Sequence, residues 1–413
     1  MTLKLNKKLL VILILVPSIA TAGIVTSIIL IVLQDESIES KIQNWMTNGQ
    51  IPSLGACIII NDTVVWAKGF GDQPDLDTVY MIGSITKSFT ATAILQLYEK
   101  SFLDLNDNIE DYVPFDVRHP DYPAFDVTIE MFLTHTAGLA TNYAWSLEYY
   151  FNNQTIIWIN EKFGWDIVIW DDRPTLEQFL NESLNPAGAY YDDRTWQSRP
   201  GSMFRYSNAG YYLLGYLVEK ITNQSLTSYI QENIFDPLNM SRTGYYYEDF
   251  MGSNAIPYEW NNSLFELPLY NINSTGAGQI RSTIPDMARY LTTFMNYGEY
   301  KGTQILTPAS VGLMHSIHEP LTGTSVEGFD NAGYGYGWFL YEGGYKGHGG
   351  ATPGYSSNMF FKNWSGSTFG VFLTFNRGSA LIYDEALINN YIPAINKLLL
   401  DESKHRFQQA LSS

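Results

Sequence analysis

Residues 81–87 read MIGSITK, and a long helical pattern starts at Ser84 within this stretch and continues to about Lys100. Ser84 and Lys87 are three positions apart, so on a helix they share one face and their side chains can meet. A serine hydroxyl is a poor nucleophile until a base removes its proton, and a lysine can be that base when burial or neighbouring cations lower its pKa. The first turn also presents unpaired backbone N–H groups to an anion. The stretch therefore predicts a nucleophile at Ser84 with Lys87 as its base.

A second segment, FRYSNAG at residues 204–210, supplies two groups that suit the same chemistry. It is needed because an S-x-x-K spacing alone is weak evidence, with about one chance match expected in a chain of this length. A tyrosine close to a lysine ammonium loses its proton more readily, so Tyr206 can relay protons. Asn208 can hydrogen-bond both the lysine and a substrate amide. The segment predicts a proton relay beside Ser84.

A third segment, GHGGA at residues 347–351, lies on a predicted late strand. Glycines such as Gly350 let a substrate approach the strand backbone. The Ala351 N–H, paired with that of Ser84, would form an oxyanion hole. His348 would add polar or cationic help beside it, because an imidazole titrates near neutrality. The segment predicts the substrate-binding edge of the site.

Together these motifs resemble those of the class C β-lactamase-like, or penicillin-binding-protein-like, serine hydrolases of the D-alanyl-D-alanine-peptidase and esterase type. The ordered motifs are Ser84-x-x-Lys87, Tyr206-x-Asn208 and His348-Gly349-Gly350. The resemblance covers roughly residues 36–400. It implies an α/β sandwich with a helical region, and an acyl-enzyme on Ser84 that is formed and hydrolysed without a metal or cofactor. The substrate would be a small molecule or a peptide with an ester or amide bond.

The chain departs from the β-lactamases proper at His348-Gly349-Gly350, where they carry Lys-Thr-Gly. The change replaces a permanent cation with a titratable group and removes a hydroxyl that would bind a substrate carboxylate. Histidine at this place is common in the esterases and peptidases of the family, so the resemblance does not imply a β-lactamase. The family also has members without demonstrated catalysis. A catalytically idle binding or scaffold ectodomain is therefore the alternative function.

The fold class follows from where the strand-like and helical patterns fall along the chain. Strands are expected at residues 55–60, 63–70, 334–340, 344–348, 355–361 and 367–375. Helices are expected at 36–48, 84–100, 127–135, 176–182, 207–221, 225–232, 284–297, 307–315 and 382–400. This order predicts an α/β (α+β) sandwich, in which an antiparallel sheet from N- and C-terminal segments is flanked by helices. A mainly helical region, at about residues 100–280, would be inserted between the strands.

The N-terminus carries an uncharged run of 25 residues, Leu9 to Leu33, after Lys4, Lys7 and Lys8. Such a run reaches roughly 37 Å as a helix, enough to cross a bilayer core. The flanking charges predict a cytoplasmic start, an anchor within residues 1–34, a hydrolase domain at 35–400 outside the cell membrane, and a tail at 401–413. The alternative is a secretory signal cleaved after Ala20-Thr21-Ala22.

Composition excludes several other classes of protein. The formal net charge is −18, which disfavours nucleic acid as a partner. The single cysteine, Cys57, allows no internal disulfide, and His315 and His318 have no third ligand that would make a metal site. The oligomeric state stays open. Eight Asn-x-Ser/Thr triplets predict a glycoprotein, at Asn61, Asn153, Asn181, Asn223, Asn239, Asn261, Asn273 and Asn363.

Two further segments have competing interpretations. His135, in the segment FLTHTAGL at residues 132–139, is interpreted as part of a loop that ends a helix. Residues 141–200 hold five of the ten tryptophans: Trp145, Trp158, Trp165, Trp170 and Trp196. They predict either an inserted helical subdomain with its own core or an aromatic wall over the acyl pocket.

Overall fold

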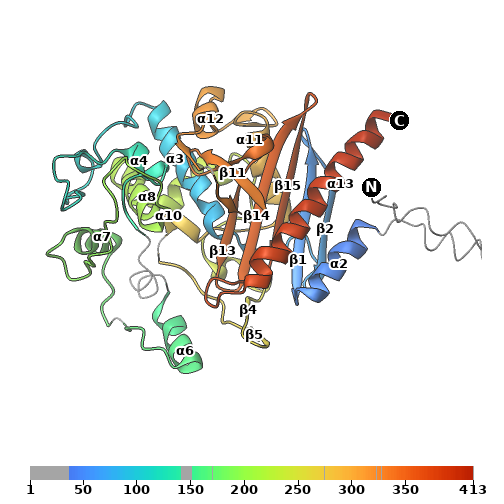
Figure 1. Cartoon of the computed structure of the whole chain (residues 1–413), viewed down its shortest axis with the longest axis horizontal. Helices are drawn as coiled ribbons and strands as arrows, with labels where there is room; N and C mark the ends of the chain where they lie inside the picture. The colour runs from blue at the N-terminus through green and yellow to red at the C-terminus, as the bar shows by residue number, and fades with distance from the viewer. Residues whose placement is uncertain are drawn as a thin grey trace, which may run out of the picture. The chain divides into compact units, whose positions relative to one another are not determined.

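The computed structural model describes residues 37–140, 151–169, 171–273, 275–321, 323–326 and 328–412. Residues 42–413 form one compact unit built on a nine-stranded antiparallel sheet. The strand order is β10-β11-β12-β13-β14-β15-β1-β2, and β9 pairs with β11 (Figure 1). The strands are β1 (Ser53–Ile60), β2 (Thr63–Gly71), β9 (Glu319–Pro320), β10 (Ser325–Val326), β11 (Phe329–Tyr334), β12 (Phe339–Tyr341), β13 (Lys346–Thr352), β14 (Tyr355–Trp364) and β15 (Ser367–Phe375). The predicted fold class is confirmed, because N-terminal β1 pairs directly with C-terminal β15.

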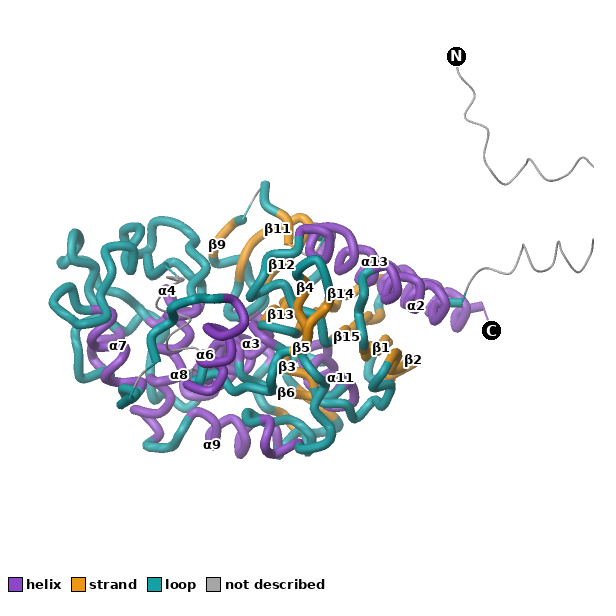
Figure 2. Tube along the Cα trace, turned by 90° about the horizontal axis from the view of Figure 1, so that it is seen from below, coloured by secondary structure: helices purple, strands orange, loops and turns teal. Residues whose placement is uncertain are grey.

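β1 reads as a continuous apolar strand because both of its faces are covered. It turns into β2 at Asn61, whose φ of 56° lies in the left-handed region that asparagine tolerates. The two faces of the sheet are visible at neighbouring residues of β15. Phe369 contacts Phe407 of α13 (Ile392–Ser412), whereas a side chain at Gly370 would meet Met295 of α11 (Ile284–Met295). Helices α13 and α11 therefore cover opposite faces of the sheet (Figures 1 and 2).

The helical region packs around α3 (Thr86–Glu99), whose side chains are buried from Thr86 to Leu97. A helix that is enclosed on all sides needs few charges, which explains its weakly amphipathic sequence. α8 (Asn208–Thr222) packs against it. Its first turn is capped by Ser207, whose side chain accepts a hydrogen bond from the Gly210 N–H. The remaining helices are α2 (Ile38–Asn48), α4 (Ile129–Leu133), α6 (Asn153–Phe163), α7 (Leu176–Leu184), α8 (Asn208–Thr222), α9 (Leu226–Ile230), α10 (Thr275–Gly278) and α12 (Pro308–Met314).

The structure differs from the predicted elements at several places, of which three concern the predicted strands and helices themselves. The strand expected at 334–340 is split into β11 and β12 by a turn, in which Gly337 has a φ of 75° and a Cβ would lie 2.9 Å from the Lys87 carbonyl oxygen. The helix expected from Ser84 begins with a 3-10 turn, Gly83–Ile85. The last helix continues to Ser412, past residue 400 where a tail was expected. In the first two cases, close contact with another segment overrides the local pattern.

The described tryptophans of the segment 141–200 serve mainly as packing residues. Trp196 is buried in the main core, and Trp158 packs on a second cluster that joins α6 to Tyr270 and Tyr355. Helix α6 was not predicted. Trp145 and Trp170 lie outside the described residues. Since its core is shared with the rest of the chain, the described part of this segment is not a separate subdomain.

The predicted localisation, a single-pass membrane protein with an outer catalytic domain, is contradicted. Within the described ranges, no helix combines the length and the apolar character that a bilayer crossing requires. The longest of these helices, α13, has 21 residues but carries charges such as Asp401, Lys404 and Arg406. The run Leu9 to Leu33, on which the predicted anchor and the membrane contact depended, lies outside the described residues.

Candidate active site

Ser84 lies in the 3-10 turn that immediately precedes α3. Gly83 enables this turn, because its φ of 55° is in the left-handed region and a Cβ there would lie 2.8 Å from the Ala351 nitrogen. The turn contacts β13, which lies beside α3 in Figures 1 and 2. Ser84 is half-buried and Lys87 is fully buried one turn later. The local geometry therefore places both side chains at the junction of the sheet and the helical region.

The Lys87 Nζ has three neighbours, each from a different part of the chain. It lies 3.1 Å from the Ser84 Oγ, 2.7 Å from the Asn208 Oδ1 and 2.9 Å from the Ala277 carbonyl oxygen. It also lies 4.9 Å from the centre of the Tyr206 ring. The structure thus brings together Ser84, Lys87, Tyr206 and Asn208, as the sequence predicted.

Burial lowers the pKa of Lys87 well below its ordinary value, because the charged form loses its hydration. A neutral amine has two hydrogens and one lone pair. Asn208 Oδ1 and the Ala277 carbonyl can only accept, so they hold the two hydrogens and leave the lone pair facing the Ser84 hydroxyl. The three distances therefore match a lysine poised to accept the serine proton.

Asn208 owes its position to the start of α8. The helix is capped by Ser207 rather than by Asn208, so the Asn208 side chain is available to Lys87. The Ala277 carbonyl belongs to the single turn α10, which packs closely on α8. Glycine is needed at Gly276, because a Cβ there would lie 2.2 Å from the Tyr211 carbonyl oxygen. These two helices deliver the two acceptors that orient the amine.

Tyr206 precedes α8 and is enclosed by aromatic rings. Its ring stacks parallel to Phe339 at 6.4 Å and lies 4.4 Å from the His135 ring. His348 is 6.4 Å away on β13. Tyr206 is therefore held between the helical region and the strand that carries His348.

Of the two kinds of help expected from His348, polar or cationic, the structure supports the polar one. Its side chain is buried, and burial together with nearby Lys87 lowers its pKa to about 3. Its Nδ1 lies 2.6 Å from the Gly349 carbonyl oxygen, which can only accept, so Nδ1 carries the proton. Its Nε2 then accepts from the Tyr334 hydroxyl at 3.2 Å. His348 is a neutral residue with both ring nitrogens occupied.

Gly350 and Ala351 cross the Ser84 turn at backbone contact distance. A Cβ at Gly350 would lie 1.9 Å from the Ile82 carbonyl oxygen and 3.2 Å from the Ser84 nitrogen. Only glycine fits here. This close crossing brings the backbone nitrogens of Ser84 and Ala351 near each other. Ala351 is exposed, so this part of the site is open to solvent.

Sequence reasoning missed four contributors to this site: the Ala277 carbonyl, the ring of Tyr211 near Lys87, the Tyr334 hydroxyl and the His135 ring. A backbone carbonyl leaves no signal in a sequence. The aromatic residues were hidden among many, since the chain has 29 tyrosines and 22 phenylalanines. In the described residues, no group of three or more His, Cys, Asp or Glu side chains could hold a metal ion.

A groove of about 460 Å³ adjoins the site along β13 and β14. Gly350 and Ala351 line it together with Ser357, Asn358 and Asn389. Because two of the predicted site residues form part of its wall, this groove is the candidate for binding the part of a substrate next to the reacting bond.

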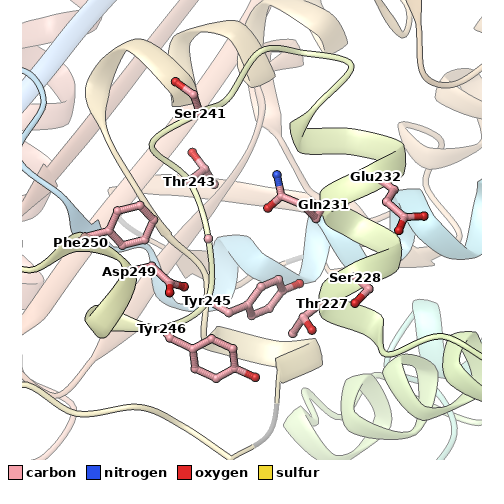
Figure 3. A pocket seen from close by; sticks show the side chains of 11 residues that line it. Thr227, Ser228, Gln231, Glu232, Ser241, Thr243, Tyr245, Tyr246, Asp249 and Phe250 are labelled. Atoms are coloured by element: carbon pink, nitrogen blue, oxygen red, sulfur yellow. The ribbon is translucent and has the colours of Figure 1, made fainter.

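A second cavity of about 460 Å³, shown in Figure 3, lies elsewhere in the molecule. It is formed by α9 and the segment 241–250, with Gln231, Tyr245 and Asp249 among its lining residues. None of the predicted site residues lines it, so this cavity is separate from the Ser84 site.

Comparison with known proteins agrees with this arrangement. Residues 38–390 match the Beta-lactamase family. The chain is 28% identical over 316 residues to Protein flp of Staphylococcus aureus, covering 74% of this chain and 55% of that one. It is 28% identical to the octameric penicillin-binding protein homologue from Pyrococcus abyssi, with a TM-score of 0.69 over 88% of this chain and 77% of that one.

A D-amino acid amidase from Ochrobactrum anthropi shares the fold, with a TM-score of 0.66 at 20% identity over 90% of this chain and 99% of that one. The chain spans about half the length of the curated relatives that it matches. The predicted family is therefore confirmed. The chain belongs to the β-lactamase family.

Proposed function

We propose that this protein is a serine hydrolase that cleaves an ester or amide through an acyl-enzyme on Ser84. The observation that carries the proposal is the position of the Lys87 amine, 3.1 Å from the Ser84 Oγ and held by two further acceptors at 2.7 and 2.9 Å. We propose residues 35–400 as the catalytic domain. Glycosylation of the eight triplets stays a prediction.

In the acylation step, the Ser84 oxygen attacks the substrate carbonyl carbon and its proton passes to neutral Lys87. Lys87 becomes an ammonium ion, whose third hydrogen then faces the former serine oxygen while the other two stay on Asn208 and Ala277. Burial opposes that charge, so Lys87 returns the proton readily. A lysine with a lowered pKa is thus suited to a transient role as base.

Tyr206 is proposed to protonate the leaving group as the tetrahedral intermediate collapses, and to regain its proton from the Lys87 ammonium. The support for this role is the position of its ring, 4.9 Å from the Lys87 Nζ. Water then attacks the acyl-enzyme with the same groups acting in reverse, which releases the acid and restores the Ser84 hydroxyl.

The backbone N–H groups of Ser84 and Ala351 are proposed as the oxyanion hole. Their support is the close crossing of β13 over the Ser84 turn, which needs glycine at Gly83 and Gly350. Rigid backbone donors stabilise the charge that develops on the carbonyl oxygen and need no rearrangement during the reaction.

We expect the substrate to be uncharged near the reacting bond. The residues that line the adjoining groove are all neutral, and His348 is neutral at any pH above about 3. The formal net charge of −18 also repels anions. Neutral esters and amides should therefore be cleaved in preference to substrates with a carboxylate beside the bond.

The test is active-site labelling followed by substrate profiling. A fluorophosphonate should label Ser84, identified by peptide mass, and should not label the Ser84→Ala variant. A panel of p-nitrophenyl esters, D-amino-acid amides and nitrocefin would then define the bond that is cleaved. A folded wild-type protein that takes no label at Ser84 would instead support the idle binding or scaffold protein.

A further inference from the structure

The loop at residues 134–140 lies along the segment that leads to Tyr206. Backbone hydrogen bonds join the two: the Ala140 N–H donates to the Thr195 carbonyl, and the Gln197 N–H donates to the Gly138 carbonyl. The Gly201 N–H donates to the Thr136 carbonyl in the same way. The loop therefore fixes the path of the backbone that leads to Tyr206.

His135, in the same loop, makes two further hydrogen bonds, one on each side of Tyr206. Its carbonyl accepts from the Arg205 N–H at 2.7 Å, and its Nδ1 accepts from the Ser207 N–H at 3.1 Å. Its ring also lies 4.4 Å from that of Tyr206. A single residue therefore holds the backbone before Tyr206, the backbone after it and the face of its ring.

The chemical form of His135 is determined by these contacts. Because Nδ1 accepts from a backbone N–H, the ring is neutral and its proton is on Nε2. Nε2 is buried without a hydrogen-bond partner among the described residues, in a shell of the aromatic rings of Phe204, Tyr211 and Tyr334. Burial lowers the pKa of His135 well below its ordinary value, which keeps the acceptor at Nδ1 available.

The backbone of His135 has a φ of 59°, in the left-handed region that non-glycine residues adopt uncommonly and that asparagine, aspartate and histidine adopt more readily than the others. This conformation lets one residue turn its carbonyl toward Arg205 and its side chain toward Ser207, the two residues that flank Tyr206. Observed strain of this kind is often retained where it positions a reacting group.

We propose that His135 is a positioning residue for Tyr206, holding the phenol where it protonates the leaving group. The inference rests on the proposed function of the Ser84 site. It predicts a specific kinetic pattern, because a poor leaving group such as methoxide needs a proton from Tyr206, whereas p-nitrophenolate leaves without one. Loss of His135 should therefore harm the hydrolysis of an alkyl ester more than that of the matching p-nitrophenyl ester.

The experiment compares four variants with the wild type on methyl butyrate and p-nitrophenyl butyrate. His135→Leu keeps the volume but removes the acceptor, whereas His135→Asn restores an oxygen acceptor in a residue that tolerates the left-handed backbone. Tyr206→Phe gives the pattern expected when the phenol is lost. His119→Leu is the matched control, because His119 is also buried and its Nδ1 accepts a backbone N–H, that of Asp121, at the same 3.1 Å.

Because both esters form the same butyryl-enzyme, the leaving-group effect is measured on acylation, through kcat/KM. His135→Leu should lower kcat/KM for methyl butyrate by about 100-fold and for p-nitrophenyl butyrate by less than about 10-fold. Tyr206→Phe should show the same difference between the esters. His135→Asn should recover kcat/KM to within about fivefold of wild type, and His119→Leu should keep kcat/KM within about twofold despite a lower Tm.

Two results would overturn the inference while leaving the proposed function intact. One is an equal loss on both esters for His135→Leu, no larger than that of His119→Leu. The other is a folded His135→Asn variant as impaired as His135→Leu. Failure of the proposed function would be recognised separately, since wild-type Ser84 would then take no fluorophosphonate label.

Discussion

Lys87 and Arg377 are both buried cations, but their surroundings are opposite. Arg377 forms an ion pair with Asp384, and the two side chains are only 5% and 9% exposed. Its guanidinium also donates to the Gly49 carbonyl and lies over the Trp260 ring, just after β15 ends. The described hydrogen-bond neighbours of Lys87 include no counter-charge: they are a hydroxyl, an amide oxygen and a backbone carbonyl.

The difference shows how a fold separates a structural charge from a reactive one. A buried arginine beside a carboxylate keeps its proton, because its ordinary pKa is far above neutrality and the opposite charge offsets part of the lost hydration. A buried lysine that meets only neutral acceptors is pushed toward the neutral amine, which is the form that accepts a proton from Ser84. The comparison yields four predictions, from the largest effect to the smallest.

Ser84→Ala should lower kcat by at least about 10⁴-fold, because the residues of such a unit act together. Lys87→Ala should be nearly as inactive for the same reason. Steady-state hydrolysis of a p-nitrophenyl ester measures the loss, and circular dichroism checks that the fold is retained. Residual activity above a few per cent in folded Ser84→Ala would show that the nucleophile lies elsewhere.

Arg377→Met should lower the free energy of unfolding by roughly 3–5 kcal/mol, because it leaves Asp384 buried without its partner. Urea denaturation measures this cost, and kcat per folded molecule should stay near that of the wild type. The double variant Arg377→Met with Asp384→Leu should recover part of the stability, since no unpaired charge remains. A large fall in kcat at full folding would mean that Arg377 is not purely structural.

Asn208→Asp should make the surroundings of Lys87 resemble those of Arg377. A carboxylate at this distance raises a neighbouring lysine pKa by about 1–3 units, so a larger fraction of the amine is protonated at neutral pH. Activity at pH 7 should fall about 10- to 1,000-fold, and it should recover as pH rises through the new pKa. Asn208→Ser is the neutral control. The pH–rate profile decides: an acidic limb that does not move toward higher pH contradicts Lys87 as the base.

His348→Gln should weaken the acid sensitivity of the fold. The pKa of His348 is about 3 in the folded protein against an ordinary value of 6.5, so the unfolded chain binds the extra proton as pH falls below about 6.5. Stability is therefore complete above that pH and declines toward pH 3, by roughly 1.4 kcal/mol per pH unit from this group. Urea denaturation at pH 7, 6, 5 and 4 should give a shallower decline for His348→Gln. Parallel declines would show that His348 is not the proton-binding group.

The sequence predicted those parts of the site that depend on local spacing or on motif order. The three-residue separation of Ser84 and Lys87 predicted their contact, and the motif around Tyr206 predicted its arrival beside them. The order of strand-like and helical segments along the chain predicted the antiparallel sheet, and the family resemblance agreed with it. Prediction failed where a remote contact controls the backbone, as at Gly337, whose turn against Lys87 divides an apparently continuous strand.

By itself, then, the sequence determined which residue types are available and in what order. It has an apolar β1, a serine and a lysine on one helix face, and glycines where β13 crosses close to the Ser84 turn. The tertiary structure decided their chemical state. The oxygens that orient Lys87 belong to residues 121 and 190 positions away, and His348 is neutral because of burial by distant segments. Desolvation depends on everything that surrounds a group, so the state of Lys87 and His348 exists only once the chain is folded.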